Sequence, residues 1–84
     1  MFFVYILHSL KEADRYYVGY TTNLEHRLDE HNSGKSEHTK PWRPWEIEAY
    51  VGFKSKSKAR EFEKYLKFGS GHAFFRKHLV SSNS

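Results

Sequence analysis

Several polar side chains stand where the surrounding sequence pattern favours apolar ones. Tyr17 lies in an alternating segment two residues before Gly19, and Arg27 and His31 are four residues apart on the apolar side of the next segment. Glu63 lies within the apolar arc of a later segment. A guanidinium binds anions, a phenol or imidazole can move a proton, and a carboxylate can bind a cation. These residue types, if brought together, could form a reactive or binding site.

Each of these side chains also has a structural interpretation. A strand tyrosine commonly belongs to the core with its hydroxyl at the edge, and Arg27 and His31 could pack their stems beside an apolar seam while their polar ends reach water. Glu63 is harder to explain in this way, because an unpaired carboxylate in an apolar stripe is costly. It needs a cation, which could be Arg27 or a metal ion.

Residues 23–32 are predicted to form the helix that carries the two basic side chains. Thr22 and Glu25 have the spacing of a capping box, so the Thr22 hydroxyl is expected to cap this helix. Gly34 provides a left-handed stop. At about 100° per residue, one inward arc contains Leu24, Arg27, Leu28 and His31.

Three segments are predicted to be strands. Residues 2–8 are apolar on both faces and are expected to form a central strand, and residues 15–21 alternate as the second arm of a hairpin. Residues 46–53 alternate with one wet face and are expected at an edge. Residues 33–45 contain two prolines and no regular period, and loops of this length in compact domains tend to be functional.

A second helix is expected from a serine cap at Ser55 or Ser57 to about Phe68, with Ala59, Phe62, Glu63 and Leu66 on its inner arc. The Gly-Ser-Gly sequence at 69–71 is expected to break it before a last short helix. The order β-β-α-β-α-α predicts one small α+β domain over residues 1–80, a three-stranded, mostly antiparallel sheet flanked by helices. A disordered tail is expected at 81–84.

Composition narrows the functional classes. The chain has 84 residues, fifteen of them aromatic and none of them cysteine, which fits a reducing cytoplasm and an aromatic core without disulfides. The apolar run at 2–7 is too short to cross a membrane, so no membrane association is expected. Residues 54–67 hold six Lys and Arg against two Glu, which equals the net charge of +4 of the whole chain. Such a basic run favours a polyanionic partner, although solvated helix faces are often charged in the same way.

Two short motifs give these residues a family context. Phe3-Val4-Tyr5 is followed, twelve positions from tyrosine to tyrosine, by Tyr17-Val18-Gly19, and then by an arginine and a histidine one turn apart and a later glutamate. In this pattern the sequence resembles the GIY-YIG nuclease superfamily over nearly its whole length. It is most similar to the small single-domain bacterial proteins of that superfamily and to the N-terminal nuclease domain of the excision-repair nuclease.

The resemblance implies a metal-dependent endonuclease that hydrolyses phosphodiester bonds in DNA, in repair or recombination. Tyr5 and Tyr17 match the two motif tyrosines, whose hydroxyls lie at the scissile phosphate and help to orient or deprotonate the attacking water. Arg27 matches the catalytic arginine, and His31 matches a position one turn later that holds histidine or tyrosine. The resemblance leaves open which group takes the proton.

The same resemblance assigns the metal and the close contacts. Glu63 matches the single carboxylate that binds a divalent metal, Mg²⁺ or Mn²⁺, and Gly19 is expected to let its strand pass close to a neighbouring element. All five catalytic and metal-binding residues are expected to line one concave surface. DNA phosphates are expected to contact the basic residues of the long loop and of the 54–67 run, namely Lys35, Lys40, Arg43, Lys54, Lys56, Lys58 and Lys67.

The sequence departs from the family pattern in three places. Phe3 stands where the family name has glycine, Tyr20 stands where some relatives have lysine, and residues 69–79 lack the asparagine that many members place near the domain end. These departures support an alternative, a nucleic-acid-binding module with the nuclease fold and weak or no catalysis. A protein-interaction domain without nucleic acid is a third interpretation.

Overall fold

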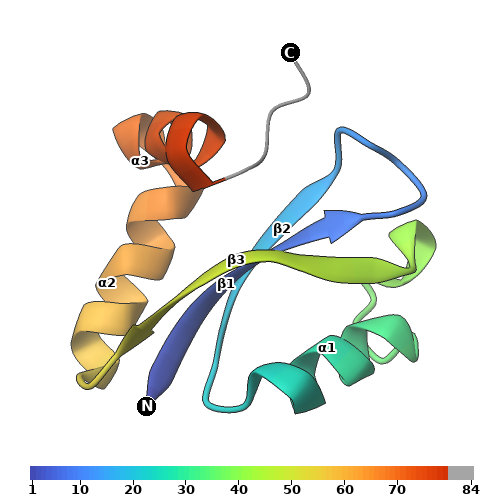
Figure 1. Cartoon of the computed structure of the whole chain (residues 1–84), viewed down its shortest axis with the longest axis horizontal. Helices are drawn as coiled ribbons and strands as arrows, with labels where there is room; N and C mark the ends of the chain where they lie inside the picture. Colours follow the sequence, from blue (N-terminus) through green and yellow to red (C-terminus); the bar gives the residue numbers. More distant parts are fainter. Residues whose placement is uncertain (80–84) are drawn as a thin grey trace.

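The computed structural model describes residues 1–79, and for residues 69, 70 and 72 the backbone alone (Figure 1). The tail predicted at 81–84 lies outside the described residues. The described elements, in chain order, are β1 (Phe2–Ser9), β2 (Tyr16–Thr21), α1 (Leu24–Asn32), the short 3₁₀ turn η1 (Lys40–Trp42), β3 (Trp45–Phe53), α2 (Lys56–Lys67), α3 (Gly69–Phe74) and the π-helical turn η2 (Phe75–Leu79). None of the helices in this part of the chain combines the length and the apolar character that a membrane crossing requires.

The three strands form one antiparallel sheet in the order β2-β1-β3. The α+β class, the central position of the first strand and the edge position of the third are confirmed. Tyr5 pairs with Gly19 on β2 and with Tyr50 on β3. A central strand has no solvated edge, which explains why β1 carries apolar residues on both faces.

The sheet separates two hydrophobic clusters. On one face, Val4 and Ile6 of β1 pack with Ala59 and Leu66 of α2 and with Phe75. The cluster on the other face joins β1, β2, α1 and the start of β3, with Tyr5, Leu7 and Trp45 buried and Tyr17, Leu24, Leu28, Trp42 and Ile47 packed around them. Figure 1 shows α1 and α2 apart from each other, with the strands between them. Alternate residues of β1 therefore serve different helices.

The ends of α1 show one wrong prediction and one confirmed. Asn23, and not Thr22, is the N-cap: its backbone is extended and its side-chain oxygen accepts the His26 backbone N–H at 3.1 Å. The helix therefore begins one residue later than the capping-box pattern indicated. Gly34 has a φ of +86°, and it ends the helix together with a hydrogen bond from the Lys35 N–H to the Glu30 carbonyl at 3.1 Å.

Helix α2 begins at the expected serine cap, Ser55, whose hydroxyl accepts the Lys58 backbone N–H at 3.3 Å. Its end differs from the prediction. The break lies at Phe68, which is extended (φ −134°, ψ 149°), and the Gly-Ser-Gly sequence forms the first turn of α3. Gly71 is required there for another reason, because a Cβ at this position would lie 1.6 Å from the Tyr65 carbonyl oxygen.

The long loop at 33–45 is fastened to the end of α1. The Asn32 side-chain amide donates to the Trp45 carbonyl at 3.0 Å, and its oxygen accepts the Trp45 backbone N–H at 2.6 Å. The buried Trp45 indole in turn donates to the Thr39 carbonyl at 2.9 Å. The loop is therefore held at both ends by hydrogen bonds that local sequence did not indicate.

We expect Asn32→Ala to lower the free energy of unfolding by about 1 to 3 kcal/mol, because it leaves the partly buried Trp45 N–H and carbonyl without their side-chain partner. Denaturant unfolding of the variant beside Ser33→Ala, a change at the next, exposed residue, measures the effect. Equal stability of the two variants would contradict it.

Candidate active site

Three of the predicted catalytic residues are hydrogen-bonded to one another across two elements. The Tyr5 hydroxyl on β1 lies 2.9 Å from His31 Nε2, and it accepts the Arg27 Nε–H at 3.3 Å. Arg27 and His31 are one turn apart on α1, so both can reach the same oxygen. The contact between the tyrosine strand and the basic face of the helix is therefore made by Tyr5.

Tyr17 on β2 joins this group through its ring. Its centroid lies 5.0 Å from that of His31 and 6.4 Å from that of Tyr5. On α2, the Lys67 ammonium lies 6.0 Å from the centre of the Tyr17 ring. Tyr17 thus contacts side chains from both of the longer helices.

Glu63 on α2 is paired with basic neighbours on its own helix. Its two carboxylate oxygens lie 3.1 Å from Lys67 Nζ and 3.8 Å from Arg60 Nη1. Arg27, one of the two cations considered from the sequence, pairs with Glu30 at 3.2 Å. An ion pair between Glu63 and Arg27 is therefore not formed, because each finds an opposite charge one turn away on its own helix.

The group has a buried layer and a surface layer. Tyr5 and His31 are 2% and 0% exposed. The side chains of Arg27 and Glu63 are 33% and 17% exposed, and Tyr17 is half-buried. The expectation that all five line one open surface is thus wrong for Tyr5 and His31, which lie beneath the other side chains because their rings belong to the core.

Burial controls the protonation of the two buried groups. It raises the pKa of Tyr5 to about 12, although the Arg27 guanidinium opposes this change. Burial, with Arg27 close by, lowers the pKa of His31 to about 4, while Glu30 acts weakly in the other direction. At neutral pH Tyr5 therefore keeps its proton and His31 is uncharged, with one ring nitrogen free to accept a hydrogen bond.

Gly19 is required by the ring of Tyr5. A Cβ at position 19 would lie 2.3 Å from the Tyr5 hydroxyl oxygen. The close approach expected from the sequence is present, and the group that makes it is the side chain of the paired residue on β1. The glycine leaves the space in which the hydroxyl meets Arg27 and His31.

The basic residues predicted to contact DNA occupy separate regions. Lys54, Lys56 and Lys58 are exposed in the turn after β3 and at the start of α2, whereas Lys35, Lys40 and Arg43 belong to the loop between α1 and β3 (Figure 1). Arg43 is half-buried, and its Nε donates to the Lys40 carbonyl at 3.0 Å. Lys67 is the member of this set that contacts Tyr17 and Glu63. The residues do not form one continuous patch.

Thr39 is a contact of the site that the sequence did not indicate. Its hydroxyl oxygen lies 2.7 Å from His31 Nδ1, and the residue is 1% exposed. The only signal in the sequence was the length of the loop that contains it.

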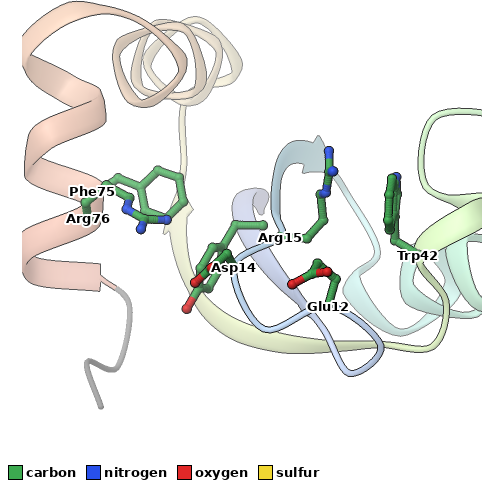
Figure 2. A pocket seen from close by; sticks show the side chains of 7 residues that line it. Glu12, Asp14, Arg15, Trp42, Phe75 and Arg76 are labelled. Carbon is green, nitrogen blue, oxygen red and sulfur yellow. The ribbon is translucent and has the colours of Figure 1, made fainter. Parts of the chain in front are cut away.

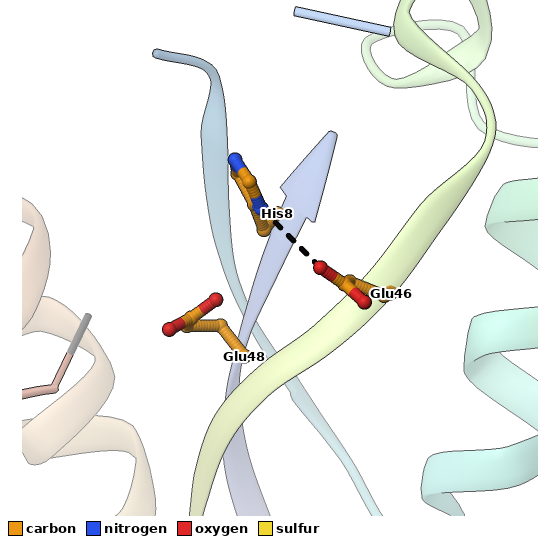
Figure 3. Close-up of side chains that lie close together, drawn as sticks. All are labelled: His8, Glu46 and Glu48. Carbon is orange, nitrogen blue, oxygen red and sulfur yellow. Dashed lines mark hydrogen bonds and ion pairs between the residues drawn. The ribbon is translucent and has the colours of Figure 1, made fainter. Parts of the chain in front are cut away.

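A second group of possible metal ligands lies apart from Glu63. His8 Nδ1 and Glu46 Oε2 are 3.4 Å apart, and with Glu48 they offer ligand atoms within 4.8 Å of one another (Figure 3). His8 points to the face of β1 opposite Tyr5, because the two positions are an odd number of residues apart. This group shares no residue with the predicted site.

A cleft of about 550 Å³ also lies away from the predicted site residues. In it the Arg15 guanidinium lies 3.9 Å from the centre of the Trp42 ring (Figure 2). The lining is completed by both acidic residues of the β1–β2 turn and by aromatic and basic side chains: Glu12, Asp14, Tyr16, Phe75 and Arg76.

The family model of the GIY-YIG catalytic domain matches residues 1–72. The chain belongs to the GIY-YIG family. The family resemblance drawn from the two tyrosine motifs is thereby confirmed, and the GIY-YIG match covers every one of the predicted catalytic and metal-binding positions. It ends before the last described turn.

Individual GIY-YIG relatives agree with this assignment. The UPF0213 protein YsiG of Lactococcus lactis is 40% identical over 95% of this chain and 72% of its own length. The structure-specific endonuclease subunit SLX1 of Debaryomyces hansenii is 35% identical over 93% of this chain, which corresponds to 23% of that larger protein. The solution structure of a UPF0213 protein of Bacillus halodurans superposes with a TM-score of 0.55 at 28% identity, covering 94% of this chain and 87% of the other.

We expect Gly19→Ala to displace Tyr5 and to lower the free energy of unfolding by about 1 to 3 kcal/mol, because the buried ring cannot move without losing its hydrogen bonds. Gly52→Ala on β3 is the matched control, since its Cβ would meet the end of the exposed Met1 side chain. Chemical denaturation compares the two, and an equally small loss in both would show that Tyr5 does not depend on the space at position 19.

The lowered pKa of His31 predicts a pH dependence of stability. Between the ordinary value of 6.5 and the folded value of about 4, the unfolded chain binds more protons than the folded one. The free energy of unfolding should therefore fall as the pH is lowered through this range, by on the order of 2 to 3 kcal/mol from His31 alone, and should not respond to His31 above it.

Thermal unfolding at a series of pH values measures this effect in the parent and in His31→Gln, which removes the titrating ring. His38→Gln, at an exposed histidine, should keep the parent's slope. The same slope in His31→Gln as in the parent would exclude His31 as its source.

Proposed function

We propose that this chain is a metal-dependent endonuclease that hydrolyses phosphodiester bonds in DNA. The observation that carries the proposal is the hydrogen-bonded group of Arg27, Tyr5 and His31, with Tyr17 against it, in a member of the GIY-YIG family. Such a hydrolysis needs an activated water on one side of the phosphorus and stabilised charge on its oxygens.

Arg27 is suited to bind the phosphate. Its Nε–H is used by Tyr5 and one terminal nitrogen by Glu30, while a third of the side chain remains exposed. The free N–H groups of a guanidinium can donate two hydrogen bonds to phosphoryl oxygens. Because Tyr5 holds the Nε, the guanidinium is oriented before DNA arrives.

Tyr5 and His31 are suited to move a proton. The raised pKa of Tyr5 shows that its hydroxyl does not ionise by itself at neutral pH. Its hydrogen bond to His31 Nε2 provides a nearby acceptor, so the phenol can pass its own proton to the imidazole as it takes one from water. In the proposal Tyr17, which is more accessible, helps to orient that water.

Glu63 is suited to hold Mg²⁺ or Mn²⁺. A partly exposed carboxylate is a hard oxygen donor, and these cations take one or two carboxylates with waters and substrate oxygens. Lys67, which now pairs with Glu63, is itself exposed and can move toward the DNA backbone. When bound, the metal would stabilise negative charge on the phosphate and favour ionisation of water.

The DNA substrate and the cellular role are also part of the proposal. The relative SLX1 is named a structure-specific endonuclease subunit, which makes branched DNA a suitable substrate to test alongside duplex DNA. A role in repair or recombination and a cytoplasmic location complete it, the latter because the sequence has no cysteine.

A nucleic-acid-binding module without catalysis is the second candidate. It is favoured by the 3.1 Å ion pair of Lys67 with Glu63, which a metal must displace, and by the absence of asparagine from residues 69–79. In that case the basic side chains would bind phosphates by charge alone.

We expect Glu63→Gln to reduce Mg²⁺-dependent cleavage by at least about 10²-fold while DNA binding is kept or strengthened, because a negative charge is removed at nearly constant volume. Cleavage of supercoiled plasmid and of branched DNA, with binding measured by fluorescence anisotropy, tests this. Glu61→Gln, at an exposed position of the same helix, is the matched control and should cleave like the parent.

The two candidates give different results in these assays. DNA binding by a parent protein that cleaves neither substrate with Mg²⁺ or Mn²⁺ would support the binding module. Full cleavage by Glu63→Gln would remove Glu63 from the metal site.

A further inference from the structure

Thr39 is buried beside His31 on the side away from Tyr5. Its hydroxyl oxygen lies 2.7 Å from His31 Nδ1, while Tyr5 lies 2.9 Å from Nε2. The imidazole is therefore held between two hydroxyl groups, each of which can donate or accept. Which nitrogen carries the ring proton depends on the directions of these two hydrogen bonds.

The direction at Nε2 follows from Arg27. Its Nε–H donates to the Tyr5 oxygen, so the phenol accepts there and needs an acceptor for its own proton. His31 Nε2 is the partner found for it, and Tyr5 is 2% exposed. If Nε2 carried the ring proton, an N–H would face the buried phenol and the phenol proton would lose this acceptor.

The direction at Nδ1 is then determined. With Nε2 as acceptor, the proton of the neutral ring is on Nδ1, and the Thr39 hydroxyl oxygen accepts it. The Thr39 hydroxyl donates its own proton to the Ser36 carbonyl at 3.4 Å. All donors in the series Arg27, Tyr5, His31 and Thr39 thus have an acceptor.

We propose that Thr39 is a positioning residue, which holds His31 in the Nδ1–H tautomer so that Nε2 stays available to the Tyr5 proton. The inference rests on the proposed function for its catalytic meaning, but the tautomer is a property of the resting protein. It assigns a purpose to the loop at 33–45, which brings a hydroxyl to the buried side of the histidine.

The backbone around Thr39 is held in place for this task. Its carbonyl accepts the Trp45 indole N–H at 2.9 Å, and its own N–H donates to the Ser36 carbonyl at 3.2 Å. The Asn32 amide fastens Trp45 to the end of the helix that carries His31. The hydroxyl and the imidazole are thus fixed to the same framework.

The test is the tautomer of His31, read by long-range ¹H–¹⁵N correlation in the ¹⁵N-labelled full chain without DNA or metal. We expect a protonated Nδ1 and an unprotonated Nε2 in the parent and in Thr39→Ser, which keeps the hydroxyl. In Thr39→Val, which removes it at similar volume, the Nδ1–H form should lose its dominance. Thr22→Val, at an exposed threonine, should behave as the parent.

Cleavage measured on the same proteins connects the tautomer to the reaction. In Thr39→Val we expect kcat to fall at least about tenfold with little change in KM, and in Thr39→Ser most of it to return. A tautomer that responds to Thr39→Val in a parent that cleaves no DNA supports the positioning role and refutes the proposed function alone.

Two results would overturn the inference. One is a parent spectrum with the proton on Nε2, which needs no variant and therefore holds even if Thr39→Val fails to fold. The other is an unchanged Nδ1–H tautomer in a folded Thr39→Val, which would show that the ring is positioned without the hydroxyl.

Discussion

A phenol, an imidazole and a threonine hydroxyl are buried together between α1 and the sheet, and each must have a hydrogen-bond partner there. An unsatisfied buried polar group costs about 1 to 3 kcal/mol, which is a large part of the stability of a small domain. The partners they find are one another and Arg27. The same bonds connect β1, α1 and the long loop, so the constraint that stabilises this face of the sheet also arranges its reactive groups.

Other features of this face follow from that requirement. Gly19 leaves space for the Tyr5 hydroxyl, and Gly34 turns the chain out of α1 so that the loop can return beneath the helix. Trp45 begins the edge strand, and its indole holds the loop backbone. Large aromatic side chains provide most of the buried area, which suits a domain of this size without disulfides. The polar group therefore lies in rigid surroundings, as a preorganised site requires.

The opposite layer contributes charge and no direct hydrogen bond to the buried group. Glu63 belongs to α2, whose apolar side packs on the other face of β1, and it raises the pKa of Tyr5 only as a minor cause after burial. Lys67 and Arg60 largely balance its charge at present. In the proposed reaction this separation allows a cation or phosphate to enter between the layers at Tyr17 without breaking the hydrogen bonds beneath.

The sequence by itself determined the order and type of the elements, because hydrophobic periodicity, caps and glycines act over a few residues. It also identified the family, because the spacing of Tyr5 and Tyr17 is a local property of one hairpin. Only the tertiary structure decided that Glu63 pairs with Lys67 rather than Arg27, that His31 is buried, and that Thr39 contacts it. Local patterns place a side chain on a face of its own element, whereas the distance between two elements depends on how all the side chains between them pack.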